Sequence, residues 1–170
     1  MQFHFEIVNS KFGKFYILDS RQGLHFILKN NDKRIKPLIK NYNPIKGLFD
    51  KNIIKVFQSN ALGNKIALKV KIKFLKCSEF QRIVWKELLK IKHGTTTFYS
   101  DIANLTSYPK AVRAVASAIG KNPISIIVPC HRVIRKNGLI GDYAWGVKMK
   151  RALLDVEVKG MADSIYRGGK

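Results

Sequence analysis

The spacing of apolar residues changes near Cys77, and this change restricts the folds open to the chain more than any other feature. Before it, FHFEIV, KFYILD and LHFILK are short apolar runs separated by turn-like residues, which predicts a three-stranded meander within residues 1–30. Lysine and apolar residues alternate over 65–76, as in a strand with one wet face. After Cys77 the spacing is helical. We therefore expect an α+β fold with two domains, 1–76 and 77–170.

Helices are expected in both domains. Short ones at 33–40 and 48–57 fit the looser stretch after the meander. The segment SEFQRIVWKELLKIKHG opens with a capping box, because Gln81 follows Ser78 by three residues, and its final His-Gly would end the helix. A last helix covers VKMKRALLDVE, and the chain from about residue 158 reads as a loose tail.

A helix-turn-helix outline lies between these helices. A short helix from about Ser100, the turn TSYP and a second helix from Pro109 to Gly120 give that outline. After it, ISIIV is expected to form a short buried strand, RKNG a turn and LIGDYAWG a glycine-bounded loop.

The net charge of +21 and the pI near 10.2 indicate a polyanionic partner, most often nucleic acid. The alternative is a lysine-rich surface from a biased or thermophilic proteome. No apolar run is long enough to span a bilayer, and the N-terminus lacks the layout of a signal peptide, so we expect a soluble intracellular protein with no membrane partner. Two cysteines without a C-x-x-C pair predict neither a disulfide framework nor a metal site.

The second helix of the outline has one basic face made of small residues. At about 100° per residue, Val112, Val115, Ala116 and Ile119 share one side of it. The other side carries Lys110, Arg113, Ala114, Ser117, Ala118 and Lys121. Small side chains let a helix approach a surface closely, so this face is expected to dock on DNA. The alternative is a helix rich in alanine only because alanine is the best helix former.

The stretch IIVPCHRVIR places Cys130 and His131 side by side between two apolar runs. Neighbours on a regular strand point to opposite faces, so the two side chains can cooperate only if the chain bends after Pro129. A nearby base or positive charge favours the reactive thiolate, and His131 and Arg132 are of these two kinds. Glu157 could orient the imidazole. The alternative is a buried structural cysteine.

The motif VPCHRVI (128–134) resembles the active-site motif of the O6-alkylguanine-DNA alkyltransferases, also called methylated-DNA–protein-cysteine methyltransferases. The stretches FQRIVWKELLKI, TFYSDIA, PKAVRAVASAIGKNP and GDYAWGVKMKRALLDVE resemble that family in the same order, so the resemblance covers about residues 78–157. It implies an RNase H-like α/β domain at the N-terminus, followed by a mostly helical winged helix-turn-helix domain that carries the active site.

The resemblance also implies direct reversal of DNA damage. The alkyl group of O6-alkylguanine, and less efficiently of O4-alkylthymine, would pass irreversibly to Cys130 after base flipping. His131 would deprotonate Cys130 through a water, and Glu157 would orient His131. Asn122 would brace the turn that follows the DNA-reading helix, and Tyr99 would protonate N3 of guanine. The alternative role for Tyr99 is that of a core aromatic.

Two further sets of residues follow from the resemblance. Arg113 would enter the duplex where the guanine was, its alternative being a phosphate contact on a solvated face. The family docks this helix in the minor groove. The remaining DNA-binding candidates are Lys110, Ala114, Ser117, Lys121 and Arg132, and the substrate-pocket candidates are Val133, Tyr143, Ala144 and Trp145. Ala144 replaces a serine common in relatives, and bulky Trp145 is expected to limit large adducts such as benzyl.

The expected partner is therefore duplex DNA containing O6-alkylguanine. No metal, organic cofactor or obligate protein partner is expected, and a monomer suits a protein consumed in one reaction. We expect it beside chromosomal DNA, in the cytoplasm or in a eukaryotic nucleus. The main alternative is a non-catalytic module that binds alkylated DNA. A plain winged-helix regulator would not need the Cys-His-Glu set, and a Cys-His hydrolase would call for an oxyanion hole.

Overall fold

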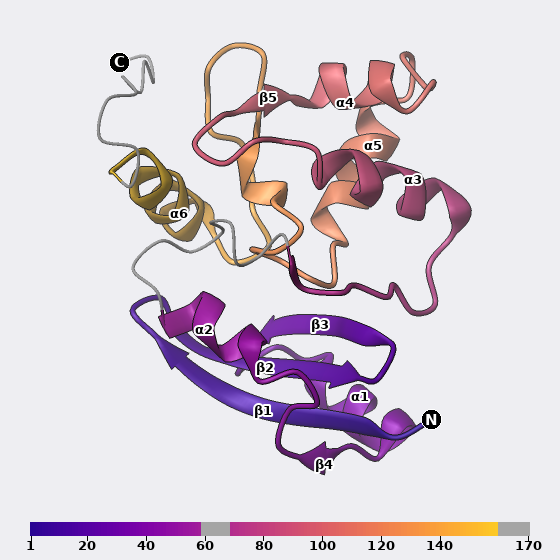
Figure 1. The fold of residues 1–170 in the computed structure, drawn as a ribbon. Coiled ribbons are helices and arrows are strands. Elements are labelled where there is room, and N and C mark those ends of the chain that lie inside the picture. The colour runs from indigo at the N-terminus through magenta and orange to yellow at the C-terminus, as the bar shows by residue number, and fades with distance from the viewer. Residues whose placement is uncertain (59–68, 160–170) are drawn as a thin grey trace. The chain divides into compact units, whose positions relative to one another are not determined.

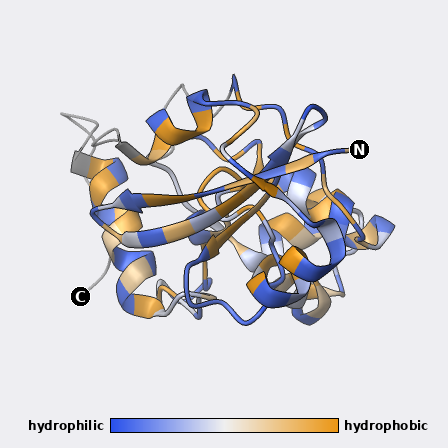
Figure 2. Ribbon diagram, turned by 90° about the horizontal axis from the view of Figure 1, so that it is seen from below, coloured by the Kyte–Doolittle hydropathy of each residue, from blue (hydrophilic) through white to orange (hydrophobic). Residues whose placement is uncertain are grey.

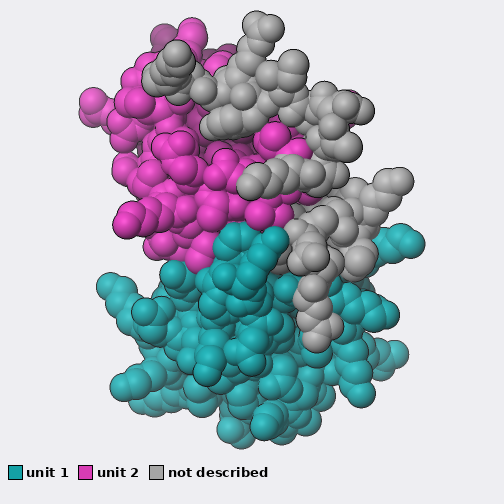
Figure 3. Space-filling model, turned by 90° about the vertical axis from the view of Figure 1, so that its left-hand side faces the viewer, with its two compact units in different colours: residues 1–76, 123–125 teal, residues 77–122, 126–170 magenta. Residues whose placement is uncertain are grey.

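The computed structural model describes residues 1–58 and 69–159 of the 170-residue chain. The chain divides into two compact units, one formed by residues 1–76 with 123–125 and the other by 77–122 with 126–170 (Figure 3). The return of 123–125 to the first unit had no signal in the sequence. Within the described part, no helix is long and apolar enough to cross a membrane. The fold is mixed α+β (Figure 1).

Unit 1 is built on a four-stranded sheet in the order β3-β2-β1-β4. Strands β1 (Phe3–Ser10), β2 (Gly13–Ser20) and β3 (Gly23–Lys29) form the expected antiparallel meander. The short edge strand β4 (Ile45–Lys46) pairs parallel with β1 and was not predicted. Helix α1 (Ile35–Tyr42) precedes β4, and helix α2 (Asn52–Gln58) packs against β1.

Two strands expected from the sequence are absent from the described residues. Residues 65–68 of the lysine-rich stretch lie outside the described part, and 69–76 contribute only an isolated bridge from Ile72 to Leu24. The segment ISIIV is buried as expected, but it forms only isolated bridges, one of them from Ile124 to Ile27. A positive φ of 79° at Ile126 turns the chain there, so an extended strand cannot continue.

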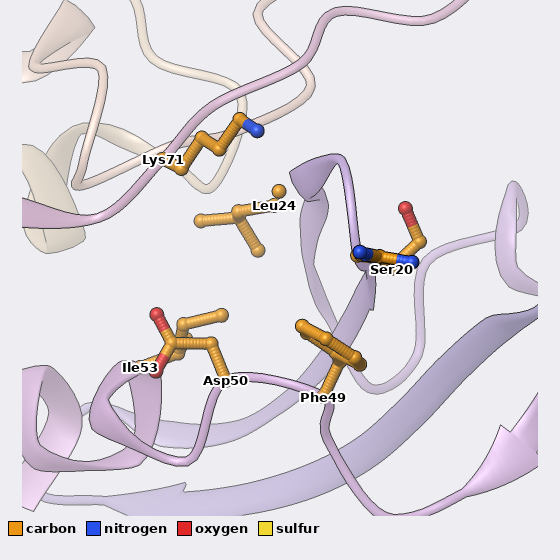
Figure 4. A pocket seen from close by; sticks show the side chains of 8 residues that line it. Ser20, Leu24, Phe49, Asp50, Ile53 and Lys71 are labelled. Atoms are coloured by element: carbon orange, nitrogen blue, oxygen red, sulfur yellow. The ribbon is translucent and has the colours of Figure 1, made fainter.

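Unit 1 also contains a cavity of about 270 Å³ (Figure 4). Its polar lining includes Ser20, Asp50 and Lys71. Beside it, Ser20 Oγ lies 2.8 Å from His25 Nε2, and His25 Nδ1 lies 2.8 Å from the Lys73 carbonyl. These bonds fasten the β2–β3 turn to the segment at residue 73. None of the cavity's lining residues belongs to the set predicted to carry the reaction.

Unit 2 is mostly helical. Its helices are α3 (Glu79–Leu88), α4 (Tyr99–Leu105), α5 (Val112–Gly120) and α6 (Val147–Lys159), and β5 (Thr97–Phe98) pairs parallel with β6 (Val133–Ile134). Helices α3, α4 and α5 pack on one another. Apolar and polar residues alternate around the helices in Figure 2, as expected where one face is buried.

The capping box of α3 is confirmed, because Ser78 Oγ accepts from the Gln81 amide at 3.2 Å and the Ser78 amide donates to Gln81 Oε1 at 3.1 Å. Two helix boundaries were wrong. Helix α3 ends at Leu88, several residues before Gly94. Helix α5 begins at Val112, because Pro109 lies in a turn closed by the Ala111 amide bonding to the Tyr108 carbonyl.

Candidate active site

The reactive motif forms a bend. Residues Cys130–Arg132 make one turn of 3₁₀ helix, labelled η2, between Pro129 and β6. The Arg132 amide donates to the Pro129 carbonyl at 3.0 Å, and the amide of Val133 donates back to the Cys130 carbonyl. In an extended strand the side chains of Cys130 and His131 would point to opposite faces. The 3₁₀ turn replaces that strand, so the bend predicted after Pro129 is present.

Asn122 reaches the thiol directly. Its side-chain Nδ2 donates to Cys130 Sγ at 3.1 Å and to the Val128 carbonyl at 2.8 Å. Both Asn122 and Cys130 are buried, at 3% and 4% exposure. A donor aimed at sulfur stabilises a thiolate, and the bond to Val128 fixes the amide in that orientation.

His131 is fixed by a carboxylate. Its Nε2 lies 2.7 Å from Glu157 Oε1, and both side chains are almost fully buried. Burial lowers the pKa of His131, although the bond to Glu157 opposes this, so the ring is neutral near pH 7. In the neutral ring, Nε2 then carries the proton and donates the hydrogen bond to Glu157. Nδ1 is left as a buried acceptor that bonds to none of the described residues.

The Glu157 carboxylate accepts hydrogen bonds from four donor groups. Besides His131, it accepts from the Nε and Nη2 of Arg132, at 2.9 and 2.8 Å, and from the Gly94 amide at 3.1 Å. Burial alone raises the pKa of Glu157, but the bonds from His131 and Arg132 outweigh it and hold the pKa at about 2. The carboxylate therefore stays ionised near neutral pH.

Arg132 was expected to contact DNA, but the structure buries its side chain. Its side chain is 6% exposed. The guanidinium pairs with Glu157, and its Nη1 donates to the Ile91 carbonyl at 2.7 Å. A buried arginine needs such partners, because an unpaired charge in the interior is costly. Arg132 thus supports the orientation of Glu157.

Tyr99 begins α4 directly after β5 and is half-buried. Burial raises its pKa, and the negative charges of Cys130 and Asp142 act in the same direction. The pocket loop, which we define as residues 139–146, passes close to the ring. A Cβ placed on Gly141 would lie 3.5 Å from the Tyr99 hydroxyl. The hydroxyl therefore stays protonated near the loop.

The pocket loop carries the other expected substrate contacts. The rings of Tyr143 and Trp145 stand edge to face at 5.8 Å and 78°, and Ala144 between them is exposed. Val133 is fully buried in β6. Among the described residues, no group of three or more His, Cys, Asp or Glu side chains could hold a metal ion.

Helix α5 presents the expected exposed face with one exception. Arg113, Ala114 and Ser117 are exposed, as are Lys110 in the preceding turn and Lys121 at the end. Ala118 was placed on that face and is instead buried at 3% exposure, where its carbonyl accepts from Trp85 Nε1 at 2.8 Å.

Lys150 on α6 is a site residue that the sequence reasoning missed. Its side chain is fully buried, and its Nζ donates to the carbonyls of Val133 and Ile140, both at 2.6 Å. Burial lowers its pKa to about 8. Lys150 precedes Leu153, Leu154 and Glu157 by three, four and seven residues, so it shares their helix face. A face analysis of this helix would have found it.

The arrangement suits nucleophilic displacement by sulfur. It contains a thiol with an amide donor and a neutral histidine with one nitrogen fixed by a carboxylate. The charge of Cys130 acts on Tyr99, and the pocket loop passes close to the Tyr99 ring. The exposed helix α5, with cations at its ends and small residues between them, belongs to the same unit.

Comparisons with known proteins agree with this chemistry. The family model described as "6-O-methylguanine DNA methyltransferase, DNA binding domain" matches residues 79–159. The probable methylated-DNA–protein-cysteine methyltransferase of Acanthamoeba polyphaga mimivirus is 41% identical over 157 residues, covering 91% of this chain and 96% of that protein. The inducible methyltransferase of the same name from Bacillus subtilis is 51% identical over 86 residues, covering 51% of this chain and 48% of that protein.

Solved structures are similar over nearly the whole chain. The crystal structure of Mycobacterium tuberculosis OGT in complex with DNA has a TM-score of 0.80 and 30% identity, covering 92% of this chain and 93% of that one. The structure of the M. tuberculosis O6-methylguanine methyltransferase also has a TM-score of 0.80, at 32% identity.

Proposed function

This chain belongs to the methylated-DNA–protein-cysteine methyltransferase family, and we propose that it moves the alkyl group of O6-alkylguanine in duplex DNA onto its own Cys130. As a member of that family it binds DNA and repairs it by alkyl transfer. The observation that carries the assignment of Cys130 is the bond from Asn122 Nδ2 to Sγ, next to the His131–Glu157 pair.

In the proposed step the Cys130 proton leaves toward Nδ1 of His131, the buried acceptor. The thiolate attacks the alkyl carbon, an S–C bond forms, and the C–O6 bond breaks. The electron pair goes to guanine, which takes a proton at N3 from Tyr99. Glu157 supports the imidazolium that forms on His131. A thioether is a poor leaving group, so each molecule acts once.

The lesion must leave the helix for this reaction, because O6 takes part in the base pair. We propose that α5 docks in the minor groove, where Ala114 and Ser117 permit close approach. Arg113 would occupy the space of the flipped base and delay its return. Lys110 and Lys121 would contact phosphates, and Val133, Tyr143, Ala144 and Trp145 would surround the extruded base.

The proposal also covers the fold of each unit, the oligomeric state and a second substrate. We describe unit 1 as RNase H-like because of its meander with a parallel edge strand, and unit 2 as a winged helix-turn-helix because α4, α5 and the β5–β6 pair suit that outline. The protein would act as a monomer beside chromosomal DNA. O4-alkylthymine would be a slower substrate.

The test is the intact mass of the protein after mixing with duplex DNA that carries one O6-methylguanine. Wild type and Cys77→Ala should gain one methyl mass per chain and then stop, whereas Cys130→Ala should gain none. Cys77 is the matched control, because it is the chain's other cysteine. If lesion DNA binds tightly and no chain gains mass, the protein is a lesion-binding module and the proposed transfer is wrong.

A further inference from the structure

Lys150 is a fully buried cation with no part in the steps above. Removing an ammonium group from water is costly unless its charge and its donors are satisfied inside the protein. A methionine or leucine would fill the same helix position without this cost. The presence of lysine at a buried position next to the reactive cysteine therefore calls for a physical reason.

The contacts of Lys150 supply one. Its Nζ donates to the carbonyl of Val133 at 2.6 Å, on the strand that follows η2 directly. It also donates to the carbonyls of Ile140 at 2.6 Å and Asp142 at 3.4 Å, both on the pocket loop. The ammonium group thus joins the two pieces of backbone that border the proposed pocket. A carbonyl has two lone pairs, so the Val133 carbonyl keeps one acceptor position for a base in the proposed pocket.

The charge of Lys150 faces the reacting groups as well. Its Nζ lies 5.7 Å from the centre of the Tyr99 ring. The charged groups that act on it are Cys130 and Asp142, which favour its cationic form, and Arg135, which opposes it. Because electrostatic attraction is mutual, the ammonium favours the thiolate of Cys130 as much as the thiolate favours the ammonium. Burial strengthens this attraction.

We propose that Lys150 is a positioning residue for alkyl transfer, whose ammonium group fastens the pocket loop to β6 and favours the thiolate form of Cys130. The proposal rests on the transfer reaction proposed above. A neutral residue of the same size would keep the packing of α6 and lose both effects. The pocket loop and the backbone of Val133 would then be held together less firmly around the substrate.

The first test compares Lys150→Met with Lys148→Met in a Cys77→Ser background that leaves one thiol. Lys148 is the matched control, because it is exposed on the same helix. The rate at which iodoacetamide alkylates Cys130 is followed against pH without DNA, and methyl transfer from O6-methylguanine duplex is followed in a single turnover. Lys150→Met should raise the midpoint of the pH profile by about one unit and slow transfer at least about tenfold at pH 7.

Lys148→Met should match the background protein in both measurements. If Lys150 has a purely structural role, Lys150→Met will lower the amount of reactive protein and leave the midpoint of the pH profile in place. That result would overturn the proposal. A Lys150→Met protein that behaves like Lys148→Met would overturn it too. Failure of the background protein to take methyl from DNA would reject the proposed function alone, since thiol reactivity is measured without DNA.

A second measurement needs no change at Lys150, in case Lys150→Met does not fold. The ε-carbon of Lys150 is titrated by ¹³C NMR before and after Cys130 is methylated with iodomethane in the Cys77→Ser protein. Methylation removes the negative charge that faces the ammonium, so the titration midpoint of Lys150 should fall by about one pH unit. An unchanged midpoint would mean that the two groups are not coupled, and the proposal would be wrong.

Discussion

Replacing Glu157 by glutamine removes one charge from the most buried ionic cluster of the site and changes almost nothing else. The carboxylate accepts from His131 at 2.7 Å, from Arg132 at 2.8 and 2.9 Å, and from the Gly94 amide. Glutamine has the same shape, but it offers one acceptor oxygen in place of two. Its amide nitrogen would face a donor, and the guanidinium of Arg132 would be buried without a counter-charge.

The magnitude follows from the pKa. The pKa of Glu157 lies at about 2 against an ordinary value of 4.5, and at about 1.4 kcal/mol per unit this corresponds to about 3 kcal/mol of folding free energy at pH 7. Removal of one partner from a buried ion pair costs about 3–5 kcal/mol, which agrees. We therefore expect Glu157→Gln to lower the free energy of unfolding by about 3 kcal/mol.

The pH dependence has a definite sign. The pKa of Glu157 is lowered in the folded state, so its stabilisation is complete above pH 4.5 and is lost as the pH falls toward about 2. The difference between wild type and Glu157→Gln should shrink over that range. The lowered pKa of His131 adds a separate loss of stability as the pH falls below 6.5, because burial disfavours its protonation.

Urea unfolding followed by circular dichroism at pH 7, 4.5 and 3 measures these differences. Glu79→Gln is the control, because Glu79 pairs with Arg82 at 3.0 Å on the exposed side of α3, where a surface ion pair contributes about 0.5 kcal/mol or less. A loss below about 1 kcal/mol for Glu157→Gln at pH 7, or an equal loss at pH 3, would refute the assignment of Glu157 as the charge that holds the site together.

Three other substitutions test separate parts of the site. Asn122→Ala removes the donor to Cys130 Sγ, so it should slow methyl transfer and lower the free energy of unfolding by about 1–3 kcal/mol in urea. Arg113→Ala should leave the melting temperature unchanged because Arg113 is exposed, and should slow repair of duplex O6-methylguanine while sparing reaction with the free base O6-benzylguanine. Trp145→Ala should speed benzyl transfer relative to methyl transfer, and equal rates in the wild type would contradict a size limit set by Trp145.

Local signals carried much of the fold. The capping box of α3, the meander of β1 to β3 and the turn at Gly138 depend on residues close together in the chain, and all three were predicted. The errors concern pairing at a distance. Strand β4 exists because it pairs with β1, about forty residues away, and ISIIV fails to be a strand because Ile126 turns the chain. No periodicity within either segment records these events.

For the candidate site too, some residues were predicted from the sequence and others were recognised only in the structure. The motif around Cys130 and the resemblance of residues 78–157 named the cysteine, histidine, asparagine and glutamate from the sequence. The structure joins them in two hydrogen-bonded pairs, Asn122 with Cys130 and His131 with Glu157. The sequence does not show whether a given arginine or lysine is exposed to DNA or buried in the protein. Arginine and lysine are exposed by default, so Arg132 was assigned to DNA and Lys150 was passed over.

The sequence alone determined the family, the cysteine proposed as the reactive thiol and the charge that suits a DNA partner. Only the tertiary structure decided which charged residues are interior. Glu157 lies 25 residues from Arg132, and Lys150 lies 17 from Val133, so these pairs form only when α6 packs against η2. The fate of a charge depends on the partners that folding places around it, because an interior charge is stable only where carboxylates or carbonyls replace the lost water.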